Sequence, residues 1–195
     1  MNSNLTEIVF ILDRSGSMHG LEADTIGGYN SFLENQKKEE GETLVTTVLF
    51  DDEYELLYNG VAINSAKLTS KQYFVRGCTA LLDAVGKTII DIKRRIANKP
   101  ENQRPSKVIF VITTDGMENA STEFTKAKVK ELITHQQEME NWEFLFFGAN
   151  IDSASTAESI GINAEDAIDF EASSAGVKSM MAEASSSVSE RRRRR

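Results

Sequence analysis

Two apolar patterns alternate along this chain of 195 residues. Short segments built around unbroken apolar runs occur at 8–12, 108–113 and 143–148, and such runs are typical of strands covered on both faces of a parallel sheet. Between them lie longer segments whose apolar residues recur every three to four positions, as in amphipathic helices. This alternation predicts a doubly wound, Rossmann-like α/β fold with a mostly parallel sheet and helices on both faces.

The helical repeats predict the following helices: 21–40, 80–97, 125–140 and 153–160. Gly41 is expected to end the first, and Thr125 is a candidate cap of the third. Glycines 27 and 28 interrupt the first helix, and we expect them to mark close packing against the sheet. A last helix at 175–188 is weakly specified, because it is rich in serine.

The remaining segments predict an antiparallel edge and several connections. Residues 44–50 and 54–58 alternate as strands around the acidic turn 51–53, which indicates a hairpin at the edge of the sheet. Residues 60–76 have no clean period and are expected to form a surface connection that leads to Thr79. A short strand at 167–170 closes the sheet, and both prolines, 100 and 105, are expected in one polar loop.

The first apolar run ends in candidate chemistry. Asp13, Ser15 and Ser17 place one carboxylate and two hydroxyls on a tight turn that Gly16 makes possible. These groups offer only oxygen, and oxygen donors with little formal charge are suited to a small hard cation, Mg²⁺ or Mn²⁺ more than Ca²⁺.

The string DRSGS resembles the D-x-S-x-S signature of the von Willebrand factor A family. The two other parts of that family's metal-ion-dependent adhesion site also have counterparts here, Thr79 in RGCTALLDAVG and Asp115 after the second apolar run. The resemblance covers nearly the whole chain. It implies the von Willebrand factor A fold, with Ser15, Ser17 and Thr79 ligating Mg²⁺ or Mn²⁺ through hydroxyls, and Asp13 and Asp115 binding directly or through water.

Plainer interpretations exist for the same residues. Asp13 and Thr79 are also good helix caps, although two carboxylates brought together without a cation would raise each other's pKa. Glu118 and Asn119 either contact a partner or form a solvated acidic loop. Cys78 is expected to be a small packed residue rather than a nucleophile.

Charge and cysteine content bound the partners. The net charge is −8, and because residues 191–195 contribute +5, the rest carries −13. An acidic body disfavours nucleic acid and anionic membranes as partners. We expect a single domain over residues 1–190 and a solvated basic tail over 191–195. One cysteine, no secretory leader and no apolar membrane span favour the cytoplasm, as in the intracellular bacterial or phage members of the family.

The function that the resemblance implies is protein binding, in which an acidic residue of a partner completes the coordination of the ion. The intracellular family also allows such a domain to be a subunit of a larger assembly. Catalysis finds less support. A dehalogenase-like phosphatase would need a second Asp at the position of Ser15, and no G-x-S-x-G or phosphate-binding glycine motif is present. The two histidines form no zinc pattern. The alternative is a metal-dependent hydrolase or phosphotransfer protein that uses the same oxygen site.

Overall fold

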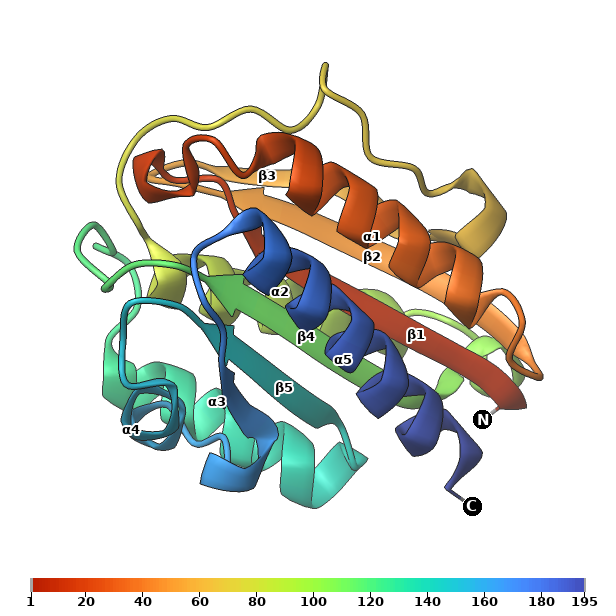
Figure 1. The fold of residues 1–195 in the computed structure, drawn as a ribbon. Coiled ribbons are helices and arrows are strands. Elements are labelled where there is room, and N and C mark those ends of the chain that lie inside the picture. Colours follow the sequence, from red (N-terminus) through yellow and green to blue (C-terminus); the bar gives the residue numbers. More distant parts are fainter. Residues whose placement is uncertain (1, 195) are drawn as a thin grey trace.

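Strands in the order β3-β2-β1-β4-β5-β6 form the centre of the computed structural model, which describes residues 2–194 (Figure 1). Every neighbouring pair is parallel except β2 and β3, which are antiparallel at the edge. The doubly wound α/β fold and its antiparallel edge strand are therefore confirmed. The strands are β1 (Asn2–Asp13), β2 (Glu42–Phe50), β3 (Tyr54–Ala62), β4 (Pro105–Thr114), β5 (Glu143–Gly148) and β6 (Ala167–Asp169).

Two layers of helices cover the sheet because the strand residues point alternately to its two faces. Phe10 faces a core formed with α1 (Glu22–Gln36) and α5 (Ser174–Arg193). Ile11 faces a second core on the other side. That second layer consists of α2 (Leu81–Ala97), α3 (Lys126–Glu140) and α4 (Ser153–Ser159). No helix of the described residues is long and apolar enough to cross a bilayer.

Several expected boundaries differ from the structure. The first helix ends at Gln36, and turns occupy the stretch up to Gly41, whose φ is +92°. Pro105 is the first residue of β4 rather than part of the preceding loop, a strand position that tolerates a missing N–H. The connection after β3 is not simply a surface segment, because Tyr73 is buried and its hydroxyl donates to the Asp13 carbonyl at 2.6 Å.

Helix α5 is longer than expected and packs along α1 (Figure 1). A β-carbon on Gly28 would lie 2.6 Å from Met181 Cγ, so this glycine serves close contact with α5 and not, as expected, with the sheet. Gly27 has open space beside it. At the last residue of α1, Gln36 Nε2 donates to the Ser185 carbonyl of α5 at 2.9 Å. The serine-rich segment, whose sequence specifies a helix only weakly, is therefore stabilised as a helix by its contacts with α1.

The solvated tail expected from residue 191 onward is wrong for Arg191 and Arg192, which lie partly buried in the last turn of α5, whereas Arg193 of the same turn is 70% exposed. Arg191 is 11% exposed and pairs with Glu143, at 3.0 Å, and with Asp166. The Lys107 ammonium donates a hydrogen bond to the Arg191 carbonyl at the end of the helix. The acidic body thus supplies partners for the basic segment. Residue 195 lies outside the described residues.

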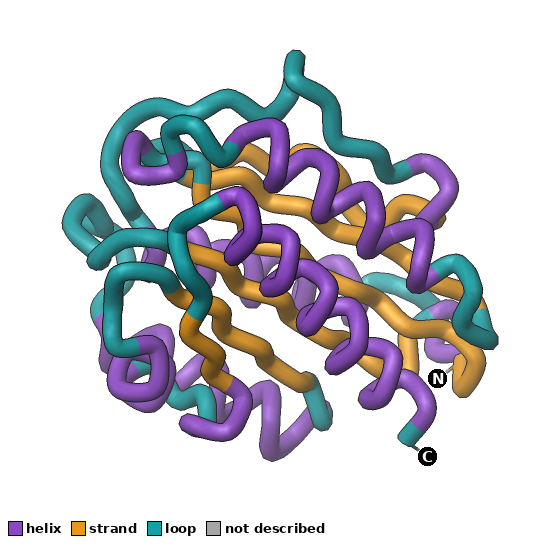
Figure 2. Tube along the Cα trace, in the orientation of Figure 1, coloured by secondary structure: helices purple, strands orange, loops and turns teal. Residues whose placement is uncertain are grey.

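Loops gather at the end of the sheet opposite the chain termini (Figure 2), where one buried carboxylate joins three of them. Asp51 Oδ2 accepts from Arg14 Nε at 3.0 Å and from Arg76 Nε at 2.7 Å. The Asp51 carbonyl accepts the N–H of Ala80 at 2.9 Å. The loop after β1, the β2–β3 turn and the loop before α2 are therefore held in one arrangement.

Replacing Asp51 with Asn should lower the free energy of unfolding by about 3 kcal/mol, because the change leaves the buried guanidinium of Arg14 without its fully buried counter-charge. Urea denaturation measures this cost. Glu53→Gln is the matched control, since that exposed carboxylate pairs only with the Arg76 side chain and should contribute little. Equal stability of the two variants would contradict the role assigned to Asp51.

Arg191→Ala should cost about 2 kcal/mol of stability, because it removes charge-assisted contacts to two partly buried acids. Arg194→Ala is the control, since its pair with Glu190 is exposed and its loss should leave the denaturation midpoint unchanged. If Arg191→Ala unfolds at the wild-type urea concentration, the basic segment does not anchor α5.

Candidate metal centre

The two candidate carboxylates lie side by side because their strands are parallel neighbours. Leu12 of β1 is paired with Thr113 of β4, so Asp13 ends one strand and Asp115 directly follows the other at the same edge. Ligands of open α/β sheets bind at this carboxyl edge. Both residues are at most 2% exposed.

Hydroxyl groups connect the two carboxylates. Asp13 accepts from the Ser15 N–H at 2.7 Å and from the Thr114 hydroxyl at 2.7 Å. The Ser15 and Ser17 hydroxyl oxygens are 3.1 Å apart, and Ser17 also donates to Asp115 Oδ1. The tight turn that the sequence predicts therefore directs its oxygens toward the end of β4.

Thr79 reaches the same place from a separate loop. A β-carbon built on Gly116 would lie 3.3 Å from Ser17 Oγ and 3.6 Å from Thr79 Oγ1, so both hydroxyls face one point beside this glycine. Asn119 holds the threonine by accepting from its N–H at 2.9 Å and donating its own N–H to the Thr79 carbonyl at 3.0 Å. The structure thus gathers all the sequence-predicted site residues at one edge of the sheet: Asp13, Ser15, Ser17, Thr79 and Asp115.

Among the described residues, no positively charged side chain pairs with the two carboxylates of this cluster. Burial raises the pKa of Asp13 to about 6, and the nearby Asp115 adds to that effect, while hydrogen bonds from Ser15 and Thr114 oppose it. Burial likewise raises the pKa of Asp115. Among the described residues neither carboxylate forms an ion pair, and Asp115 Oδ2 is buried without a hydrogen-bond partner. A bound cation would satisfy both deficits.

The donor set fits a hard divalent ion. It contains three hydroxyls and two carboxylates, and oxygen is the preferred ligand of Mg²⁺ and Mn²⁺. No group of three or more His, Cys, Asp or Glu side chains with metal-binding geometry occurs in residues 2–194, so a zinc site of the usual nitrogen and sulfur type has no counterpart there.

The plainer interpretation as helix caps does not describe these residues. Helix α1 has Leu21 at its N-cap, and α2 has Ala80, in both cases without a side-chain cap. The N-terminal N–H of Leu82 in α2 is instead satisfied by Glu118 Oε2 at 2.9 Å. Asp13 and Thr79 are therefore free of a capping role.

Other residues near the site differ from their sequence interpretation. Glu118 and Asn119 have structural contacts that the sequence did not indicate, since their side chains accept from the N–H groups of Leu82 and Thr79, although Asn119 is exposed and Glu118 only partly buried. Cys78 is exposed and not packed. The supporting ion pairs of Arg14 and Asp51 were missed, although one signal pointed to Asp51, which directly follows a strand at the carboxyl edge.

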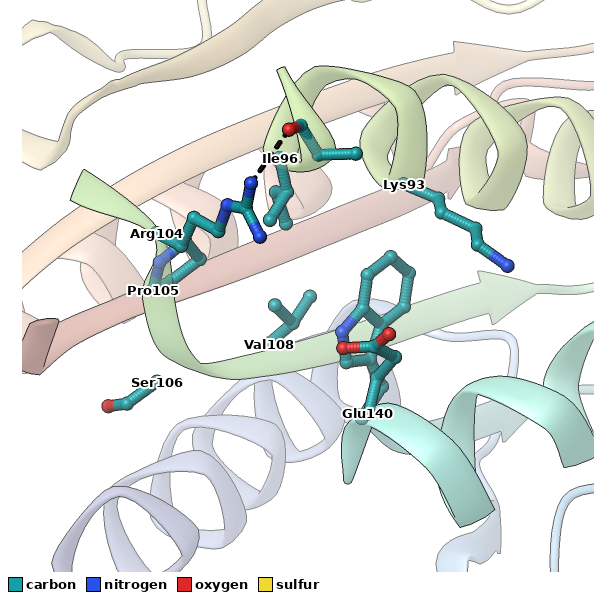
Figure 3. Close-up of a pocket in the computed structure, with 9 residues that line it drawn as sticks. Lys93, Ile96, Arg104, Pro105, Ser106, Val108 and Glu140 are labelled. Atoms are coloured by element: carbon teal, nitrogen blue, oxygen red, sulfur yellow. Dashed lines mark hydrogen bonds between the residues drawn. The ribbon is translucent and has the colours of Figure 1, made fainter. Parts of the chain in front are cut away.

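A hollow of about 110 Å³ lies at the opposite edge of the sheet (Figure 3). It is bounded by the start of β4 and the ends of α2 and α3, and Arg104 crosses it to donate to the Ala97 carbonyl at 2.8 Å. Because Pro105 begins β4 and Asp115 follows its end, this hollow is separated from the candidate metal centre by the length of the strand.

Comparison with known proteins finds similarity in structure only. No protein-family model and no curated protein matches the sequence. Proximal thread matrix protein 1 from the mussel byssus, solved with a zinc-occupied MIDAS motif, is 15% identical with a TM-score of 0.62, covering 96% of this chain and 47% of that one. The manganese-loaded TRAP protein of Plasmodium vivax is 15% identical with a TM-score of 0.62, covering 93% and 73%.

A third solved structure, the ArnB paralog VWA2 from Sulfolobus acidocaldarius, is 14% identical with a TM-score of 0.57 and covers 92% of this chain and 44% of that one. The chain thus spans about half the length of the mussel and Sulfolobus proteins. These likenesses extend over nearly all of the chain. The chain has the fold of the von Willebrand factor A domain.

Proposed function

We propose that the chain is a single von Willebrand factor A domain that binds Mg²⁺ or Mn²⁺ at the carboxyl edge of its sheet and, through that ion, a carboxylate of a protein partner. One observation carries the proposal. Asp13 and Asp115 are buried next to each other without a counter-charge, and three hydroxyls surround them.

In this proposal Asp13, Ser15, Ser17, Thr79 and Asp115 hold the ion. If Asp13 and Asp115 hold the ion through water, the protein groups that touch it directly are neutral hydroxyls, and the ion retains affinity for another carboxylate. The metals in two structural neighbours, zinc in the mussel protein and manganese in TRAP, support a divalent ion. The preference for Mg²⁺ or Mn²⁺ rests on the oxygen donors of this chain.

A protein partner is favoured by the surface around the site. Within the described residues, large exposed apolar side chains number four, and two of them border the site. Phe74 lies in the loop that leads to Thr79, and Met117 follows Asp115 by two residues. Exposed apolar groups around a polar centre are typical of protein-binding surfaces. The acidic body argues against nucleic acid and anionic membranes, and the lone cysteine favours the cytoplasm.

The alternative function is metal-dependent hydrolysis or phosphotransfer at the same oxygens. Catalysis would need a general acid or base at the site, and His19 is the histidine nearest to it in sequence. Binding without catalysis is favoured because the His19 side chain is exposed and its Nδ1 lies 3.5 Å from Glu22 Oε1. We therefore expect no turnover of generic phosphoesters in Mg²⁺ above the rate in EDTA. Turnover that requires Mg²⁺ and disappears in Asp13→Asn would favour the enzyme instead.

Asp13→Asn should weaken Mn²⁺ binding at least 100-fold, because it removes a ligand charge while preserving the size of the side chain. Titration calorimetry measures the affinity directly. Thermal unfolding gives a second readout, since Mn²⁺ should raise the melting temperature of the wild type but not of the variant. Glu138→Gln, at an exposed carboxylate of α3, is the control and should bind like the wild type. Unchanged affinity in Asp13→Asn would contradict the metal centre.

Thr79 offers a finer test of the ligand set. Thr79→Ala should reduce Mn²⁺ affinity about tenfold, a loss of roughly 1.4 kcal/mol, whereas Thr79→Ser, which retains the hydroxyl, should remain near the wild type. The same calorimetric titration compares the two variants. Equal affinity of the Ala and Ser variants would exclude the Thr79 hydroxyl from the site.

A further inference from the structure

A hollow of about 240 Å³ opens beside the candidate metal centre. Its apolar wall comes from the start of α2, the loop after β4 and the loop and helix after β5, and it includes the following side chains: Leu81, Leu82, Met117, Ile151 and Ile160. Most of this wall is fixed, since Leu81 and Ile160 are each 1% exposed. Met117, by contrast, is 73% exposed at the rim.

The hollow is continuous with the metal centre. Gly116 lines the hollow, and a β-carbon on the same glycine would lie within 3.6 Å of both the Ser17 and Thr79 hydroxyls. Leu81 follows Thr79 by two residues and forms part of the wall. The opening therefore lies next to the place where a chain segment would meet the ion.

The charged groups of the hollow leave its interior available to an apolar group. Glu118 accepts from the N–H groups of Leu82, at 2.9 Å, and Ser121, at 2.8 Å. Asp152 caps α4 by accepting from the Ser155 N–H at 2.9 Å. Lys126 lies exposed at the opening and has no ion pair among the described residues. Both carboxylates thus accept hydrogen bonds from backbone N–H groups near helix starts, which fixes them at the border of the hollow.

From this arrangement we infer, on the basis of the proposed metal-dependent binding, that the partner presents an acidic residue with a large apolar residue one or two positions away, whose side chain fills the hollow. The volume supports one side chain, because pockets for whole small molecules are usually about 300–1,000 Å³. The spacing follows from an extended segment, which advances about 3.3 Å per residue. Met117 is a flexible side chain that adapts to the shape of the inserted group.

Displayed linear peptides with one fixed central Asp and random flanks provide the probe. Peptides that bind the full chain in Mg²⁺ and are released by EDTA should be enriched in Leu, Ile, Met or Phe within two positions of the Asp. A synthetic peptide from this pool should bind at least tenfold more weakly when its apolar residue is replaced by Gly. Metal-dependent peptides that share the Asp but show no apolar enrichment would overturn this inference and leave the proposed function intact.

Matched variants test the hollow itself. Thr156→Phe places a ring into the hollow from α4, whereas Ser155→Phe adds the same ring at an exposed position of that helix. Thr156→Phe should weaken the selected peptide at least tenfold and remove its preference over the Gly version, with Mn²⁺ affinity unchanged. Ser155→Phe should bind the peptide like the wild type. Wild-type peptide binding by Thr156→Phe would overturn the inference.

The outcomes separate this inference from the function on which it rests. If calorimetry shows no bound metal, or if metal binds but no Asp peptide is retained in Mg²⁺, the proposed function fails and the inference fails with it. If Asp peptides bind in a metal-dependent manner, only the identity of their neighbours and the response of Thr156→Phe decide the role of the hollow.

Discussion

The juxtaposition of two buried carboxylates is the constraint around which this domain is arranged. Parallel pairing of β1 and β4 brings Asp13 and Asp115 to the same edge, where burial raises the pKa of each. A fold that places like charges together in a dry environment needs either protons or a cation there. The serine and threonine hydroxyls around the pair would supply further oxygen ligands for a cation, and the proposed metal centre rests on this arrangement.

The rest of the structure keeps the site loops in position. Asp51 joins the loop of Arg14 to that of Arg76, and Tyr73 donates to the carbonyl of Asp13 itself. On the face of the sheet that α1 and α5 cover, α5 is held along α1 by the contact of Met181 with Gly28. The loops that carry the proposed ligands thus rest on buried contacts, and such preorganisation would lower the cost of binding an ion there.

The central strands and the site residues could be predicted from the sequence because both depend on local patterns. Unbroken apolar runs indicate buried parallel strands, and Asp13 and Asp115 each follow such a run, so both could be assigned to the carboxyl edge of the sheet. That their strands are neighbours was implied by the resemblance to the von Willebrand factor A family. The supporting contacts could not be predicted. Pairing of Arg14 with Asp51 joins residues far apart in the chain, and the basic end of α5 is held by acids that are distant in sequence: Glu143 of β5, Asp166 before β6 and Glu39 after α1.

The most direct test of the central claim is an anomalous-difference map from crystals of the full chain grown with MnCl₂, recorded at the manganese absorption edge. The account predicts one strong peak at the carboxyl edge of the sheet, in contact with the Ser15 and Ser17 hydroxyls and between Asp13 and Asp115. No peak at that position under saturating Mn²⁺, or a peak held only by other residues, would contradict it.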